Sequence, residues 1–221
     1  CGNVKMNMTL LNRTAVFSGS YAAKDCEFLL QEVDIEPISV TEKECLLQDG
    51  SVHYSKMISS EEAPSKEYLD LFHKLIETNG DRLASEIQLL AKKVYKARGD
   101  SITIVSLARA GTPVGVLLTR ALKAKYTSDV KHYSISIVRD RGIDKAALQY
   151  IAESGRSADS VIFVDGWTAK GVINRELKQA VVDWNSNSSY KLSDELCVIS
   201  DLSGHAEYIG RGSWRGLALT L

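Results

Sequence analysis

One design occurs twice in this chain: a run of β-branched residues ends in a short turn of small residues and passes directly into a helical pattern. The two copies are SITIVSLARAGTPVG at residues 101–115 and VIFVDGWTAKG at residues 161–171. In open parallel sheets, the turns at the carboxyl ends of the strands gather at one crevice, where ligands bind. Backbone N–H groups at a helix start, in a turn that contains glycine, suit phosphate or pyrophosphate. Two such turns at one crevice predict a ligand with two phosphate-bearing ends.

Strand-like and helix-like stretches alternate from residue 101 onward. Runs rich in Val and Ile are separated by stretches with the apolar spacing of an amphipathic helix. This order predicts βαβ units with right-handed crossovers, and therefore an α/β fold in which helices flank both faces of a parallel sheet. We expect strands at 101–107, 133–138, 161–165 and 195–200, and helices at 113–124, 144–154 and 171–183.

The first part of the chain has a different character, with short strand-like pieces such as RTAVFSGSY and SVHYSKMI. Two amphipathic helices should follow, the first after Pro64 and the second after a break at Gly80–Asp81. We therefore divide the chain into an N-terminal α+β segment at 1–95, a core at 96–205, and an irregular tail at 206–221 of the kind that truncation leaves. The apolar face of the first helix consists of Tyr68, Leu69, Leu71, Phe72, Leu75 and Ile76.

Composition excludes several classes of protein. A formal net charge of −1 gives no general electrostatic reason to expect nucleic-acid binding. No apolar run reaches the roughly 18–20 residues needed to span a membrane, and no signal peptide is visible. The four cysteines are scattered, without a C-x-x-C pair or zinc-ligand spacing. Reduced thiols and a cytoplasmic location are therefore expected.

The common nucleotide-binding motifs are absent. Gly166 and Gly171 have the G-x-x-x-x-G spacing of a P-loop, but Lys170 comes one place too early and Val172 follows. A G-x-G-x-x-G fingerprint is missing as well. The phosphate expectation must therefore rest on a different kind of loop.

What remains resembles the type I phosphoribosyltransferases in the order of its loops. In that family, a loop after a hydrophobic strand carries acids for the ribose hydroxyls and binds the 5-phosphate on backbone amides. Here Phe163-Val164-Asp165 ends such a strand and supplies one acid, while Gly166 stands where the family usually has a second. The resemblance implies that this loop binds substrate through Gly166, Trp167, Thr168, Ala169, Lys170 and Gly171.

The same resemblance assigns roles to two further loops. The loop at 107–112 looks like the family's pyrophosphate loop, in which the planar fork of Arg109 suits the leaving group. The loop at 135–144 stands where the family has a mobile loop that closes over the reacting centre, and Arg139 and Arg141 fit that catalytic role. Pyrophosphate would be held by Arg109, Ala110, Gly111 and Thr112.

Several consecutive strings sharpen the resemblance: FSGSYAAKDCEFLL, HYSKMISSEEAPSKEYLDLF, SLARAGTPVGVLL, HYSISIVRDRGID and FVDGWTAKG. From about residue 17 to about residue 205, the chain resembles the phosphoribosyltransferase-like family of tellurium-resistance and stress gene clusters, also labelled the cysteine protease StiP family. The likeness implies a type I phosphoribosyltransferase-like fold with the N-terminal segment as a hood on the acceptor side.

The implied reaction transfers phosphoribose from phosphoribosyl pyrophosphate to an unknown acceptor. Asp165 would engage the ribose and, through the ribose or water, a Mg²⁺ ion that bridges the pyrophosphate. Catalysis would consist mostly of positioning and electrostatic stabilisation. Members of the family often continue into a Pelota-type RNA-binding domain, which has no counterpart here, so RNA is expected as a partner only through such a domain. A homodimer and the absence of membrane contact agree with the resemblance.

Two alternatives stay open. Gly166 in place of a second acid favours a non-catalytic phosphoribosyl or nucleotide sensor. A cysteine protease would need a thiolate beside an imidazole, but Cys26 and Cys45 have acidic neighbours that raise a thiol pKa. Cys197 lies in an apolar strand and should be buried, and His132-Tyr133 is interpreted as a structural pair at a strand edge.

Overall fold

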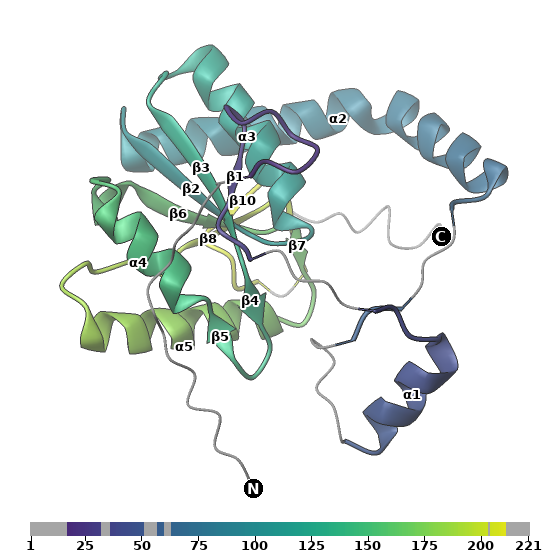
Figure 1. Ribbon diagram of the computed structural model, residues 1–221. Coiled ribbons are helices and arrows are strands. Elements are labelled where there is room, and N and C mark those ends of the chain that lie inside the picture. Colours follow the sequence, from purple (N-terminus) through teal and green to yellow (C-terminus); the bar gives the residue numbers. More distant parts are fainter. Residues whose placement is uncertain (1–16, 32–35, 51–56, 60–62, 203, 211–221) are drawn as a thin grey trace, which may run out of the picture.

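The computed structural model describes residues 17–31, 36–50, 57–59, 63–202 and 204–210. Its centre is one twisted sheet with helices on both faces, and one long helix runs beyond the sheet on one side (Figure 1). His53, Tyr54, Cys1 and the tail from residue 211 lie outside the described residues. None of the helices in the described ranges combines the length and apolar character needed to cross a membrane.

The sheet confirms the predicted α/β class. Its strand order is β1-β3-β2-β6-β8-β10, and every neighbouring pair is parallel. The chain moves from β2 to β3 in one direction, then passes back over β2 to β6 and continues to β8. The strands are β1 (Glu27–Phe28), β2 (Ile102–Leu107), β3 (Val130–Ile135), β6 (Val161–Val164), β8 (Leu196–Val198) and β10 (Tyr208–Ile209).

Each face of the sheet has its own apolar core. On one face, α3 (Gly111–Lys125) and the C-terminal half of α2 (Lys66–Arg98) pack over alternate residues of the strands, including Ile104 and Ile162. On the other, α4 (Lys145–Glu153) and α5 (Val172–Asn187) cover the residues between them. Burial on both faces explains why β2 and β6 are continuous apolar runs in the sequence.

Helix α2 contradicts the predicted break at Gly80–Asp81. It runs without interruption from its cap at Ser65, whose side chain accepts a hydrogen bond from the Tyr68 N–H, to Gly99 at φ 73°. A single glycine in a helix interior costs only about 1 kcal/mol relative to alanine. That cost is too small to end a helix whose C-terminal half is held by packing, so the two predicted helices are one.

Several short elements were not predicted. Helix α1 (Val40–Gln48) has no buried residue, and β1 and β10 have two residues each. The predicted strand at 133–138 is divided between β3 and β4 (Ile137–Val138), which forms a hairpin with β5 (Gly142–Ile143). Likewise β7 (Trp167–Thr168) pairs with β9 (Ser200–Asp201). A short 3₁₀ turn at Ala158–Ser160 precedes β6.

Helix α3 lies unusually close to the sheet because its inner face is made of small residues. A Cβ added at Gly111 would stand 2.5 Å from the carbonyl oxygen of Val164, and one at Gly115 would stand 2.4 Å from Nε2 of His132. One turn further on, the Thr119 hydroxyl donates to the Gly115 carbonyl at 2.8 Å and is fully buried. This spacing of four residues places all three residues on the face of α3 toward the sheet.

We expect Gly115→Ala to lower the free energy of unfolding by about 1–3 kcal/mol, because the new methyl group overlaps a buried imidazole. The matched control is Gly80→Ala, where a Cβ meets no atom within 4 Å. That change should raise stability by roughly 0.5–1 kcal/mol. Urea unfolding measures both, and equal effects of the two substitutions would contradict the close packing of α3.

Candidate functional site

The loops after β2 and β6 meet at the carboxyl edge of the sheet. They line a cavity of about 530 Å³ at the point where the strand order reverses, the position at which open α/β sheets bind ligands. The lining residues that matter here are Arg109, Ala110, Arg139, Asp165 and Trp167. The structure thus gathers residues from three of the predicted loops at one cavity.

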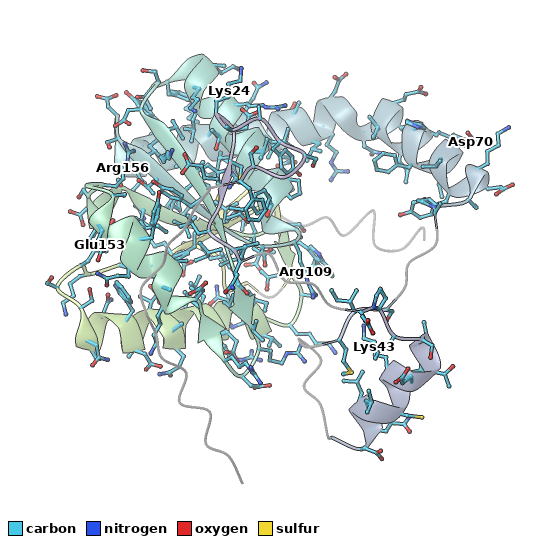
Figure 2. The ribbon with its side chains drawn as sticks, in the orientation of Figure 1. Lys24, Lys43, Asp70, Arg109, Glu153 and Arg156 are labelled. Atoms are coloured by element: carbon cyan, nitrogen blue, oxygen red, sulfur yellow. The ribbon has the colours of Figure 1, made fainter. Side chains whose placement is uncertain are left out.

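Arg109 and Asp165 face this cavity from adjacent strands. Arg109 is exposed and has a φ of 88°, a conformation that residues other than glycine rarely adopt. Figure 2 shows its position at the end of the sheet. Asp165 is half-buried, and burial raises the pKa of its carboxyl group above the usual value, although the Gly166 N–H donates to it at 2.7 Å.

A steric contact explains why glycine occupies position 166, where the resemblance leads us to expect a second acid. A Cβ at Gly166 would stand 2.7 Å from the Cβ of Ala110 and 3.2 Å from its carbonyl oxygen. The two loops are therefore in direct backbone contact at this point. A second carboxylate beside Asp165 has no room unless the loop at residue 110 moves.

Several predicted substrate-binding residues do not line the cavity. Gly111 and Thr112 are buried in the start of α3, and the Thr112 hydroxyl lies 2.8 Å from that of Ser134. Thr168 is buried in β7, while Ala169 and Lys170 are exposed beyond it. Gly171, at φ 65°, is the residue from which α5 begins. Of these residues, Gly111 and Thr112 form the first turn of α3, and Gly171 is the N-cap of α5.

The two arginines of the predicted closing loop diverge. They flank the hairpin turn at Asp140, whose φ is 65°. Arg139 lines the cavity with Arg109, whereas Arg141 lines a separate cavity of about 280 Å³ beside Glu176 and Asp183. A shared role for both at one reacting centre therefore needs a rearrangement of this hairpin.

A second constellation lies under α3. The sulfur of Cys26 is 3.9 Å from Nε2 of His132, and the Ser106 hydroxyl is 2.8 Å from the same nitrogen. Nδ1 of His132 is 2.8 Å from the Asp25 carbonyl oxygen, which can only accept a hydrogen bond. Nδ1 therefore carries the proton, and the lone pair of Nε2 faces the thiol and the hydroxyl.

Burial keeps this pair uncharged. Cys26 is 1% exposed and His132 is 3% exposed. Removal from water raises the pKa of the Cys26 thiol to about 12, with Glu27 and Asp25 adding to the effect, and lowers the pKa of His132 to about 4. At neutral pH the contact is thus a thiol against a neutral imidazole.

The sequence did not reveal this pair. The sequence predicts His132 at the edge of a strand, but it lies inside β3, opposite Ile104 of β2. The two partners are 106 residues apart, so no local motif joins them. The parallel pairing of β1 with β3 brings them together.

The other described cysteines have different surroundings. Cys45 is exposed in α1, and Cys197 is fully buried in β8, where burial raises its thiol pKa, as expected for an inert core residue. Among these three thiols in the described ranges, only Cys26 has an imidazole nitrogen within reach of its sulfur. The same ranges hold no group of three or more His, Cys, Asp or Glu side chains that could bind a metal ion.

Comparison with known proteins assigns the chain to a family. Residues 19–213 match the family model described as "Tellurite-like stress resistance cysteine protease StiP". The chain is 44% identical over 191 residues to the cysteine protease StiP of Acinetobacter baylyi (strain ATCC 33305 / BD413 / ADP1). That alignment covers 86% of this chain and 49% of the relative, so the chain spans about half the length of the curated relative it matches.

Solved structures offer a more distant likeness. A hypothetical protein from Neisseria gonorrhoeae with bound ppGpp matches at a TM-score of 0.41 and 13% identity, over 60% of this chain and 80% of that one. The hypoxanthine phosphoribosyltransferase of Trypanosoma cruzi, in complex with IMP, matches at 0.43 and 16%, over 60% and 72%. Likeness at this level carries no argument about ligands or activity.

The predicted transfer of phosphoribose was wrong as the main function. The family model and the curated relative are both described as cysteine proteases, which agrees with an alternative that the sequence left open. Both descriptions name an enzyme. Among the described residues that line the cavity, Asp165 is the one acid, and contact with Ala110 leaves no room for a second at position 166. Mg²⁺ and phosphoribosyl pyrophosphate stay predictions.

His132 should make stability depend on pH. In the unfolded chain its imidazole protonates near the reference pKa of 6.5, and in the folded protein only near 4. Between these values the unfolded chain binds more protons, so stability falls as the pH falls, by about 3 kcal/mol in total. Between pH 7 and 4.5, the unfolding free energy of the wild type should therefore fall more steeply than that of His132→Gln.

A second measurement is independent of whether that variant folds. In the wild-type protein, the imidazole proton resonances of His132 should not titrate above pH 5 in NMR spectra. Titration near pH 6.5 would contradict the buried, neutral state.

Proposed function

The chain belongs to the StiP family, and on that premise we propose that it is a cysteine protease in which Cys26 is the nucleophile and His132 its base. The observation that carries the proposal is the 3.9 Å contact between the Cys26 sulfur and Nε2 of His132. Support also comes from Asp25, whose carbonyl oxygen fixes the imidazole tautomer from the opposite side. A thiol, a base and a group that orients the base are the parts that nucleophilic catalysis needs.

The chemistry follows from these positions. His132 would take the thiol proton on Nε2, and the thiolate would attack the carbonyl carbon of a peptide bond. The imidazolium would then give its proton to the leaving amine as the acyl-enzyme forms, and water would release the acyl group. In the described arrangement the Asp25 carbonyl accepts a hydrogen bond from Nδ1, a contact that favours the charged imidazole.

The proposed active site is buried, and three cationic side chains hold the segment from Lys24 to Glu27 in place over it. Arg120 of α3 forms an ion pair with Asp25 at 2.6 Å, and the Lys123 ammonium donates to the carbonyl of Lys24 at 2.8 Å. From β3, Lys131 forms an ion pair with Glu27. A peptide can reach Cys26 only if the segment from Lys24 to Glu27 moves, and entry of water would bring both pKa values toward their ordinary ranges.

We expect Cys26→Ser to lower the hydrolysis of fluorescein-labelled casein at least about 100-fold, because a hydroxyl is a far weaker nucleophile beside the same imidazole. Cys45→Ser is the control for an exposed thiol and should keep wild-type activity. Full activity in Cys26→Ser, or loss of activity in Cys45→Ser alone, would sink the assignment of Cys26.

The closing contacts make a separate prediction about thiol reactivity. Arg120→Ala should speed the alkylation of Cys26 by iodoacetamide at least about tenfold, because the segment then opens more often and the thiol ionises when it meets water. The control is Lys125→Ala on the same helix, whose ammonium binds Gln88 and does not touch the segment. Peptide mass spectrometry gives the rate at each cysteine. Equal rates in the two variants would show that Arg120 does not hold Cys26 closed.

A further inference from the structure

The N-terminal half of α2 lies away from the body of the protein. Every residue from Lys66 to Thr78 is exposed, whereas burial starts in the C-terminal half, at Glu86 and Ile87. The helix extends past the sheet in Figure 1, and Asp70 stands near its far end in Figure 2. A helix that leaves the body in this way gains no stability there from packing within the described chain.

This half of the helix is amphipathic all the same. Its apolar residues occupy one side, and Lys66, Asp70 and Glu77 occupy the other. The apolar side continues the stripe of Leu83, Ile87 and the residues after them that packs on the body. We call it the α2 patch, and its members are 38–62% exposed: Tyr68, Leu69, Leu71, Phe72, Leu75 and Ile76.

The α2 patch is as large as the largest apolar patches on typical monomers, which are often functional. Its six side chains expose on the order of 600 Å², which is the upper end of the largest patch on a typical monomer. Two such patches in contact would bury about 1,200 Å², the area at which specific interfaces begin. The area therefore suits pairing of two copies.

We propose that the α2 patch binds the α2 patch of a second copy of this chain, with the two helices antiparallel about a two-fold axis. An isologous contact requires a surface that complements itself. Glu67 and Lys74 provide this, because they lie seven residues apart along the same border of the patch, next to Leu71. In an antiparallel pair, Glu67 of each copy comes beside Lys74 of the other.

The proposal does not depend on the proposed protease activity. Cys26 and His132 lie under α3, whereas residues 66–78 make up the exposed end of α2. The oligomeric state and the activity on casein can therefore be measured separately. A variant that loses one property should keep the other.

The first test is sedimentation equilibrium of the whole chain from about 1 to 100 μM. We expect the wild type to dimerise in this range, and Phe72→Glu to weaken the dimer at least about tenfold, because it buries a carboxylate in the apolar contact. Lys66→Gln is the matched control, since it changes the charge by the same amount on the opposite side of the helix. A monomeric wild type, or equal weakening by both variants, would overturn the proposal.

A charge exchange tests the antiparallel arrangement. Glu67→Lys alone places a lysine beside Lys74 of the other copy at both symmetry-related contacts and should weaken the dimer several-fold. Adding Lys74→Glu restores opposite charges and should return the wild-type dissociation constant. A double variant no tighter than Glu67→Lys would overturn the antiparallel pairing. Equal far-UV circular dichroism spectra of all variants would confirm that the fold is intact.

Discussion

The close approach of α3 to the sheet is the constraint on which the rest of this structure depends. Gly111 and Gly115 bring the helix so near that no side chain fits between its backbone and β6 or His132. Near the carboxyl ends of β2 and β3, the residues on this face are correspondingly small, with Ser106 and Ser134 both fully buried. Larger apolar residues in these positions would lift the helix and separate the loop at residue 110 from the loop at residue 166. The distance between α3 and the sheet therefore determines both the shape of the crevice and the burial of the Cys26–His132 pair.

Two chemically distinct places result from this one arrangement. The crevice at the carboxyl edge has Arg109, Arg139 and Asp165 around an open cavity, whereas the thiol and the imidazole lie inside the sheet under helix α3. The fold alone favours the crevice, since open α/β sheets bind ligands there. Family membership favours thiol chemistry instead. A fold supports many functions. Here the fold suggests the residues of the crevice as the functional site, whereas the family description suggests Cys26 and His132.

The sequence predicted the parts of the fold that leave a periodic signal. Buried strands such as β2 and β6 are continuous apolar runs, and the loops that follow them do meet at one cavity. The two-residue strands β1 and β10 have no period of their own and exist through pairing alone. The sequence could not predict why glycine occupies position 166 either, because the atom that excludes a side chain there belongs to Ala110, more than fifty residues earlier. The polar residues of β3 are visible in the letters KHYS, but the pairing of this strand with β1 is not.

The pairing of β1 with β3 also has a consequence for synthesis of the chain. The partners Cys26 and His132 are separated by 106 residues. At roughly 5–20 residues per second, a ribosome needs on the order of 5–20 s to reach β3 after the cysteine has been made. During that interval the thiol has neither its imidazole nor its cover, so it meets solvent and oxidants as an ordinary cysteine. The β1 edge of the sheet therefore stays open until β3 has been made, and the Cys26 thiol beside it is unprotected for that time.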